Sequence, residues 1–285
     1  MQERISPATR LAGSVHLPGD KSISHRYAML AAIAEGTSRI QNYATGADCR
    51  STLSCLRSLG VGIATEASEV SIEGRGLDGL REPAADLDAG NSGSTMRMLS
   101  GILAGQAFLS RMAGDASLSR RPMDRIMLPL RQMGARIEAR EGRFPPLEIR
   151  GAPLRPIDYP LPVPSAQVKS CVLLAGLYAG GSTTVAEPII TRDHTEIALR
   201  EFGAQVERRG AIITVQGRPK LEARQLVVPS DLSSAAFFMV AALLAPDSRV
   251  LIHGVGLNPT RSGLLDFLVA MGARVRIQNL ASHHG

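Results

Sequence analysis

The sequence contains no tryptophan and few other aromatic residues, which limits the ligands it can recognise by stacking. Four tyrosines and six phenylalanines are spread over 285 residues. Single-stranded nucleic acids are usually bound on aromatic platforms, and the longest basic runs here are the pairs Arg120-Arg121 and Arg208-Arg209. The net charge of +6 is therefore better explained by small anionic substrates than by a nucleic-acid partner.

Cysteine is also scarce, and long apolar runs are missing. Cys49, Cys55 and Cys171 form neither a disulfide framework nor a paired metal-binding spacing. The longest apolar run, Ala235–Ala245, is shorter than the roughly 18–20 residues that a membrane helix needs. The first ten residues include no apolar segment of a secretory signal. We expect a soluble cytoplasmic protein with no membrane partner.

The remaining composition is that of an ordinary folded protein. Hydrophobic residues make up 44% and charged residues 20% of the chain, so a sizeable core can form. At about 150 residues per domain, the length suggests two domains. Lysine is rare. Of the 32 basic residues, 29 are arginines and three are lysines: Lys21, Lys169 and Lys220. A lysine inside a polar motif therefore draws attention as a compact point charge.

The chain repeats itself at intervals of 74, 69 and 69 residues, measured between Gly60, Gly134, Gly203 and Gly272. Each glycine lies in an octapeptide of the pattern Leu-x-x-apolar-Gly-small-x-β-branched: Leu56–Ile63, Leu130–Ile137, Leu199–Val206 and Leu268–Val275. The pattern predicts a helix that ends at a left-handed glycine and is followed by a strand.

A second helix precedes each octapeptide and is apolar on nearly every side. These helices are expected over Ser22–Ala34, Ser94–Ala104, Ser165–Ala179 and Ser233–Leu244. Such helices should be buried rather than amphipathic. The fold class is therefore α/β, built from repeated units of about 70 residues with two helices and several strands each.

Each apolar helix begins at a small polar turn that could bind an anion. The unpaired N–H groups and the positive dipole end of a helix start suit phosphate or carboxylate. Lys21, Arg26, Arg97 and Lys169 follow these turns closely. The alternative is that the Ser, Asp and Asn side chains there simply cap the helices.

Three further candidates stay open on the residues alone. Arg120-Arg121 could clamp an anion or be a solvated surface pair. Arg192-Asp193-His194 could be an anion site, include a catalytic histidine, or be a helix start capped by Asp193 or Thr195. His25 and Cys171 lie in apolar helices and are expected to be structural.

Six motifs in one order carry a resemblance across essentially the whole chain. They are LPGDKSISHR (17–26), DAGNSGSTMR (88–97), GDASLSRRPM (114–123), PSAQVKS (164–170), TRDHTE (191–196) and NPTRSG (258–263). Together they resemble the 5-enolpyruvylshikimate-3-phosphate synthase family, and the PSAQ and TRDHTE forms resemble its class II bacterial members.

The resemblance implies a fold, a reaction and a cellular role. The fold is an inside-out α/β barrel of six β/α units in two domains, with the substrates in the cleft between them. The enolpyruvyl group of phosphoenolpyruvate is transferred to the 5-hydroxyl of shikimate 3-phosphate and phosphate is released, without metal or organic cofactor. This transferase serves the shikimate pathway of aromatic amino acid biosynthesis and is the glyphosate target.

The resemblance also assigns site residues. Lys21 is expected to contact both substrates and to be catalytic. The shikimate 3-phosphate contacts are expected to be Lys21, Ser22, Arg26, Ser165, Ala166, Gln167 and Arg192. The phosphoenolpyruvate contacts are expected to be Lys21, Gly93, Arg121 and Gln167. A methyl group added at Gly93 would crowd the phosphoenolpyruvate pocket and glyphosate with it, and glyphosate tolerance stays undecided.

The sibling family that acts on UDP-N-acetylglucosamine shares the fold and the enolpyruvyl chemistry. It would have Lys-Asn where this chain has Lys21-Ser22, and usually a reactive cysteine in the loop corresponding to 114–122, where this sequence has none. The shikimate enzyme is therefore the better match.

The repeat count falls short of the family's six units. We expect an N-terminal strand (1–18) that belongs to the second domain, a three-unit substrate-binding domain (19–229), and the first unit of an incomplete second domain (230–285). Four of six units leave apolar helix faces uncovered, and the family's catalytic acid/base pair lies in the missing units. The chain is expected to be a truncated form, inactive unless a complementary C-terminal fragment is supplied. The alternative is a short enzyme made competent by self-association.

Overall fold

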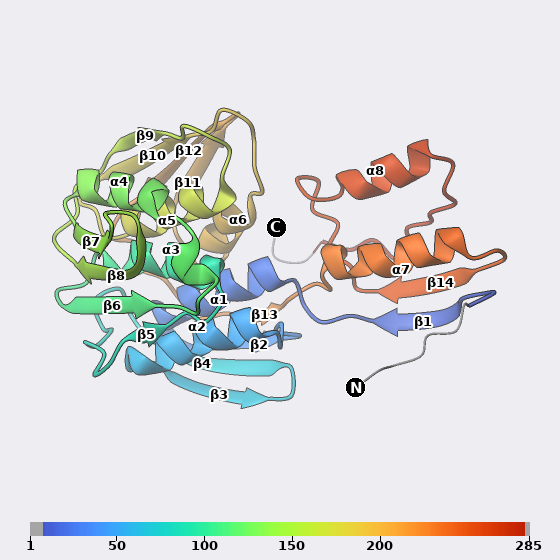
Figure 1. Ribbon diagram of the computed structural model, residues 1–285, viewed down its shortest axis with the longest axis horizontal. Coiled ribbons are helices and arrows are strands. Elements are labelled where there is room, and N and C mark those ends of the chain that lie inside the picture. The colour runs from blue at the N-terminus through green and yellow to red at the C-terminus, as the bar shows by residue number, and fades with distance from the viewer. Residues whose placement is uncertain (1–7, 283–285) are drawn as a thin grey trace.

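The computed structural model describes residues 8–282, and these residues form a larger and a smaller part (Figure 1). The larger part contains three four-stranded sheets, and the smaller part is built on a two-stranded sheet. No helix among the described residues is long and apolar enough to cross a membrane. The mixed α/β content confirms the expected fold class.

The three sheets of the larger part share one pairing pattern, in which one parallel pair is followed by two antiparallel pairs. The first sheet has the order β13 (Gln225–Val227), β2 (Glu35–Gln41), β4 (Glu69–Arg75), β3 (Gly62–Glu66). The second has β5 (Leu87–Asp88), β6 (Leu109–Ala113), β8 (Phe144–Arg150), β7 (Arg136–Arg140). The third has β9 (Asp158–Pro160), β10 (Ser182–Ala186), β12 (Ile212–Gln216), β11 (Val206–Arg209).

In each sheet, one strand of the parallel pair is reached by a crossing of the chain from another sheet, and the three crossings form a closed cycle. After β4 the chain crosses to the second sheet as β5, and after β8 it crosses to the third as β9. After β12 it returns to the first sheet, where β13 pairs with β2. Each sheet is thus completed by the preceding one, which ties residues 35–227 into a single structure.

Three helices form the apolar centre of the larger part, as the sequence predicts. These are α1 (Lys21–Ala32), α3 (Gly93–Leu103) and α5 (Ala166–Gly176), and nine residues of each are buried. The contact between α3 and α5 is close, since a Cβ on Gly101 would lie 2.3 Å from the carbonyl oxygen of Cys171. Cys171 is fully buried, which confirms its predicted place in the core.

The outer helices of the larger part are α2 (Ala47–Ser58), α4 (Asp124–Met133) and α6 (His194–Glu201), and each ends as its octapeptide predicts. Gly60, Gly134 and Gly203 have positive φ angles of 86°, 113° and 96°, and β3, β7 and β11 follow them.

The fourth octapeptide differs. Gly272 follows α8 (Gly263–Ala270) with φ 92°, but the described residues after it form no strand, so that prediction is wrong. A strand needs a hydrogen-bonding partner, and none of the strands in the described part of the chain pairs with 273–278.

The smaller part joins the two ends of the chain. β1 (Ala12–His16) pairs in parallel with β14 (Arg249–His253). Residues 1–7 of the predicted N-terminal strand segment and 283–285 of the last unit lie outside the described residues.

Helix α7 (Leu232–Leu244) does not follow the predicted burial. Within this fully described helix only Leu232 and Ala235 are buried. Phe237 and Leu244 are 79% and 80% exposed. The helix is apolar all round, but β14 is its main packing partner, so most of its surface is uncovered. This exposure confirms the expectation of uncovered apolar faces in this segment.

The chain passes between the two parts twice, and hydrogen bonds join these two connecting segments to each other. The N–H of Asp20 donates to the carbonyl of Pro229 at 2.7 Å, and the N–H of Asp231 donates to the carbonyl of Pro18 at 3.0 Å. Asp231 also caps α7 by accepting a hydrogen bond from the N–H of Ser233. Asp231 therefore both joins the two parts and caps α7.

His25 is a core residue, as predicted. It is fully buried, and its Nδ1 lies 2.7 Å from Oγ1 of Thr52. Burial, and secondarily the nearby Arg26 charge, lowers the pKa of His25 to about 3. The imidazole is therefore neutral in the folded protein at neutral pH.

This burial predicts a specific acid sensitivity. Because the pKa of His25 is about 3 in the folded protein and about 6.5 when unfolded, its contribution to stability is present above about pH 6.5 and lost as the pH falls toward 3. Between about pH 7.5 and about pH 5 the His25→Gln variant should lose about 2 kcal/mol less unfolding free energy than the wild type. Urea unfolding at both pH values measures this, and an equal loss in both proteins would contradict it.

Candidate functional site

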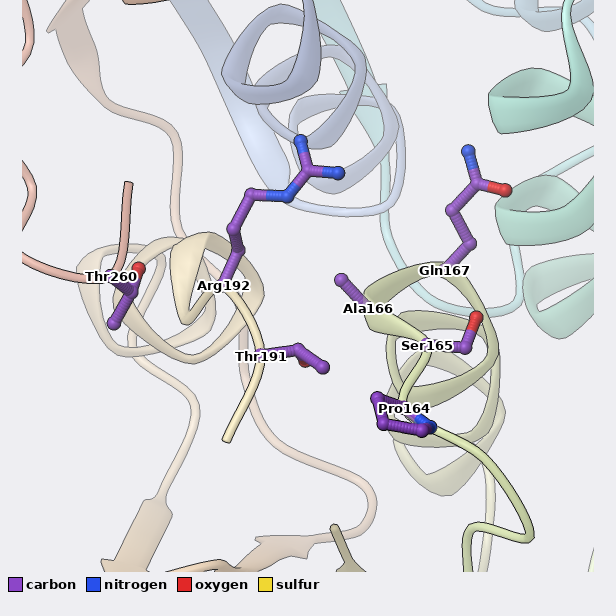
Figure 2. A pocket seen from close by; sticks show the side chains of 7 residues that line it. All are labelled: Pro164, Ser165, Ala166, Gln167, Thr191, Arg192 and Thr260. Atoms are coloured by element: carbon purple, nitrogen blue, oxygen red, sulfur yellow. The ribbon is translucent and has the colours of Figure 1, made fainter. Parts of the chain in front are cut away.

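A cavity of about 430 Å³ lies between the start of α5 and the loop that precedes α6 (Figure 2). Its lining consists of Pro164, Ser165, Ala166, Gln167, Thr191, Arg192 and Thr260. Four of the residues predicted to contact shikimate 3-phosphate are among these: Ser165, Ala166, Gln167 and Arg192. The structure thus brings together two motifs that are about 25 residues apart in sequence.

One wall of the cavity is a helix N-terminus. Ser165 caps α5 by accepting a hydrogen bond from the N–H of Val168 at 3.3 Å, and Ala166 and Gln167 open the helix. The first-turn N–H groups and the positive end of the helix dipole therefore border the cavity, where they favour an anion.

The opposite wall carries a full positive charge. Arg192 is exposed there, and Figure 2 shows it on the loop that faces α5. Burial, and then the nearby Arg261 guanidinium, lowers the pKa of Arg192. Clustered guanidinium groups repel one another, so an anion bound at this wall would reduce the repulsion between them.

Arg26 lies deeper than the cavity lining. It is 4% exposed, and its guanidinium donates to Oγ1 of Thr195 at 2.6 Å and to Oγ of Ser170 at 2.8 Å. It also donates to the carbonyl and hydroxyl oxygens of Ser22. Burial, and secondarily Arg192, lowers the pKa of Arg26 to about 10, so it stays charged. Arg26 therefore connects α1 to α5 and α6 and orients Ser22.

Lys21 opens α1 outside the cavity lining and remains accessible. Its side chain is 54% exposed, and its Nζ lies 2.9 Å from Oδ2 of Asp48. Asp48 is in the first turn of α2 and is a neighbour that the sequence motifs do not reveal. This exposed ion pair is weak, so Lys21 can be withdrawn from Asp48 by an anionic ligand.

A second group of cations adjoins the first through Gln167. Its amide oxygen accepts from Nη1 of Arg97 at 2.9 Å, and its amide nitrogen donates to Oγ of Ser94 at 2.8 Å. Arg121 donates to Oδ1 of Asn91 at 2.7 Å. Burial, and then Arg121 and Arg125, lowers the pKa of Arg97.

Gly93 lies within this second group. A Cβ there would be 2.7 Å from Nη1 of Arg97 and 3.6 Å from Nη1 of Arg121. The residues assigned to phosphoenolpyruvate by resemblance, Gly93, Arg121 and Gln167, are therefore close to one another.

Lys169 does not serve as an anion-binding cation at the start of α5. Its side chain is fully buried, with Nζ 3.2 Å from Glu187 and 2.8 Å from Glu196. The earlier expectation for Lys169 is wrong, because two carboxylates from other elements hold its charge inside the protein.

The Arg192-Asp193-His194 cluster divides into separate roles. Asp193 occupies the N-cap position of α6, and its Oδ1 accepts from Nδ2 of Asn258 at 2.7 Å and from Oγ1 of Thr260 at 3.2 Å. His194 is buried, and burial followed by the Arg26 charge lowers its pKa to about 3. A neutral, enclosed His194 is a structural group, and Arg192 is the member of the cluster that lines the cavity.

Thr191 and Thr260 line the cavity although neither was a predicted contact. Both lie in quoted motifs, but a threonine by itself carries no signal for a ligand. Thr260 comes from the loop between β14 and α8, so its place depends on how the smaller part packs. Within residues 8–282, no group of three or more His, Cys, Asp or Glu side chains is placed to hold a metal ion.

Comparisons with known proteins agree on one family. The family model for EPSP synthase (3-phosphoshikimate 1-carboxyvinyltransferase) matches residues 5–283. The 3-phosphoshikimate 1-carboxyvinyltransferase of Solibacter usitatus is 66% identical over 100% of this chain, which covers 67% of that relative. The enzyme of the same name from Koribacter versatilis is 57% identical over 99% of this chain and 66% of its own length.

A solved structure of EPSP synthase from Acinetobacter baumannii has a TM-score of 0.90 and 49% sequence identity with this chain. The match covers 95% of this chain and 61% of that one. The chain thus spans about two thirds of the length of the relatives that it matches. With the family model matched from residue 5 to residue 283, the chain belongs to the EPSP synthase family.

Proposed function

We propose that this chain takes part in the transfer of the enolpyruvyl group of phosphoenolpyruvate to the 5-hydroxyl of shikimate 3-phosphate, with release of phosphate. The cavity is the observation that supports this most directly. It joins the N-terminus of α5 to Arg192 and so offers hydrogen-bond donors and positive charge to one phosphate group.

The two substrates would occupy adjoining regions. Shikimate 3-phosphate would lie at Ser165, Ala166 and Arg192, with Ser22 held toward it by Arg26. Phosphoenolpyruvate would lie at Gly93 and Arg121. Gln167 would border both ligands, since it lines the cavity and also binds Arg97.

Lys21 would add a positive charge near the reacting groups of the two substrates. In the reaction, the 5-hydroxyl gives up its proton as its oxygen forms a bond to C2 of phosphoenolpyruvate, and the methylene carbon gains a proton and becomes a methyl group. The carbon–oxygen bond to phosphate then breaks in the tetrahedral intermediate as the methyl group loses a proton, which restores the carbon–carbon double bond. The residues of this chain would bind and orient both polyanions, and Lys21 would stabilise the phosphate that leaves. The resemblance places the acid and base in family units beyond the four described here.

We propose that the chain comprises four of the six units of an inside-out α/β barrel. The shared pairing pattern and the cyclic strand exchange support a three-unit domain over 19–229. The order α7, β14, α8 matches α1, β2, α2, which supports 230–285 as the first unit of a second domain. The strand β1, within 1–18, would belong to that domain through its pairing with β14.

The proposed partner is the portion of the relatives that this chain does not match. The exposed apolar side chains of the smaller part would pack against it, and the most exposed of these are Phe237, Leu244, Phe267, Met271 and Leu280. We also propose a cytoplasmic location, supported by three buried cysteines that are free thiols, as is usual in reducing compartments.

The first test is phosphate release. The purified chain would receive shikimate 3-phosphate and phosphoenolpyruvate, alone and together with the unmatched portion of the Solibacter relative. We expect no turnover alone and turnover when both pieces are present, because binding groups and the acid/base pair would then meet. Absence of turnover in both mixtures, together with absence of shikimate 3-phosphate binding, would contradict the proposed function. Turnover by the chain alone would overturn the need for a partner.

Lys21→Ala should abolish shikimate 3-phosphate binding. The ammonium at the start of α1 is accessible and its ion pair with Asp48 is exposed, so its main contribution would be to the ligand. Lys220→Ala is the matched control, since Lys220 is an exposed lysine paired with Glu35 at 3.5 Å. Isothermal titration calorimetry of both variants measures the effect, and equal affinities would show that Lys21 does not bind the ligand.

Gly93→Ala should weaken phosphoenolpyruvate binding by about tenfold, which corresponds to about 1.4 kcal/mol. The added methyl would press on Nη1 of Arg97, a flexible end that can move but would lose its hydrogen bond to Gln167. Thermal stability and shikimate 3-phosphate affinity should stay near the wild-type values. Gly180→Ala is the control, because a Cβ there meets nothing within 4 Å. Titrations would be made with both pieces present, and unchanged phosphoenolpyruvate affinity would refute the prediction.

A further inference from the structure

Four charged side chains link the elements that carry the two walls of the cavity. Nζ of Lys169 lies 3.2 Å from Oε2 of Glu187 and 2.8 Å from Oε1 of Glu196. Arg208 approaches the same two oxygens, at 3.3 and 3.0 Å. The first three side chains are fully buried and that of Arg208 is 19% exposed. Two cations thus balance two carboxylates, as buried ions require, and we call these four residues the charge quartet.

The charge quartet reaches the Arg192 wall through Glu187. The second carboxylate oxygen of Glu187 accepts hydrogen bonds from the backbone N–H of Thr191, at 3.1 Å, and from the Thr191 hydroxyl. Thr191 is a cavity residue and precedes Arg192. Glu196 lies in the first turn of α6, which begins two residues after Arg192. Both carboxylates of the charge quartet therefore hold the same wall.

Lys169 belongs to the other wall. It lies on α5, and its backbone N–H donates to the carbonyl of Ser165 at 3.0 Å, one helical turn earlier. Arg208 is different, because it lies on β11, which follows α6 directly in the chain. Both cations neutralise the same carboxylates, but Lys169 is the one that connects them to α5.

We propose that Lys169 is a positioning residue that sets the spacing of the two cavity walls. By holding Glu187 and Glu196 against α5, it fixes the distance at which Ser165 and Arg192 face a single phosphate group. A compact ammonium shielded from water suits this role, since its contacts depend steeply on distance. The ligand named here is that of the proposed function, but the spacing itself requires no ligand.

The test compares two variants with the same change of charge. Lys169→Met and Arg208→Met each remove one cation from the same carboxylates. Spin labels at Val163→Cys and Ile189→Cys, exposed positions beside each wall, report the spacing by double electron–electron resonance without ligand, and the native cysteines are buried. We expect Lys169→Met to shift or broaden the distance distribution and Arg208→Met to keep that of the wild type.

A double variant distinguishes the loss of the Lys169 contact to the two carboxylates from the loss of charge balance. Lys169→Met/Glu196→Gln restores neutrality but not the connection to α5, so its distances should stay altered. It also keeps the test available if Lys169→Met alone fails to fold. Wild-type distances in the folded Lys169 variants, recovery in the double variant, or an equal change in Arg208→Met would each overturn the positioning role.

Ligand affinity provides the second readout. Calorimetry should show shikimate 3-phosphate binding about tenfold weaker in both Lys169 variants and within about threefold of wild type in Arg208→Met. Altered distances with unaltered affinity in the Lys169 variants would overturn the claim that the spacing serves the ligand. If the wild type does not bind shikimate 3-phosphate while the distances change as expected, the proposed function fails and the spacing role of Lys169 stands.

Discussion

The larger part of this protein depends on enclosing three helices that are apolar on nearly every side. A helix without a polar face is stabilised by covering all of its sides, and α1, α3 and α5 are surrounded in this way. The strand exchange among the three sheets accomplishes this, because each sheet lends a strand to the next and the last returns to the first. Burial of these helix bodies leaves their N-termini as the natural place for polar chemistry.

Positive charge near the cavity is organised at two depths. Arg192 and Lys21 are accessible and can meet a ligand, whereas Arg26 and Lys169 are enclosed and bound by protein oxygens. Removing an ion from water is expensive unless its partners are placed well. The enclosed cations therefore act on neighbouring elements, with Arg26 connecting three helices and Lys169 connecting α5 to the loop and helix opposite.

The smaller part differs from the larger one because its apolar helices are not enclosed. Its two-stranded sheet and helices α7 and α8 carry large exposed apolar side chains, although the chain segments that enter it are joined by short backbone hydrogen bonds. Patches of this kind on a protein surface usually mark an interaction site. Backbone hydrogen bonds thus hold the smaller part to the larger one, while the apolar side chains of α7 and α8 are left exposed.

Local patterns in the sequence predicted the buried helices of the larger part and its glycine-terminated outer helices, because helical period, caps and left-handed glycines act over a few residues. The motifs were also sufficient for four of the cavity residues. The burial of Lys169, the pairing of Lys21 with Asp48 and the entry of Thr260 could not be read in this way. Each depends on side chains 18 or more residues apart in the sequence that meet across packed elements. Whether a cation faces a ligand or a buried carboxylate is a property of that packing, since the same lysine one turn into a helix can serve either purpose.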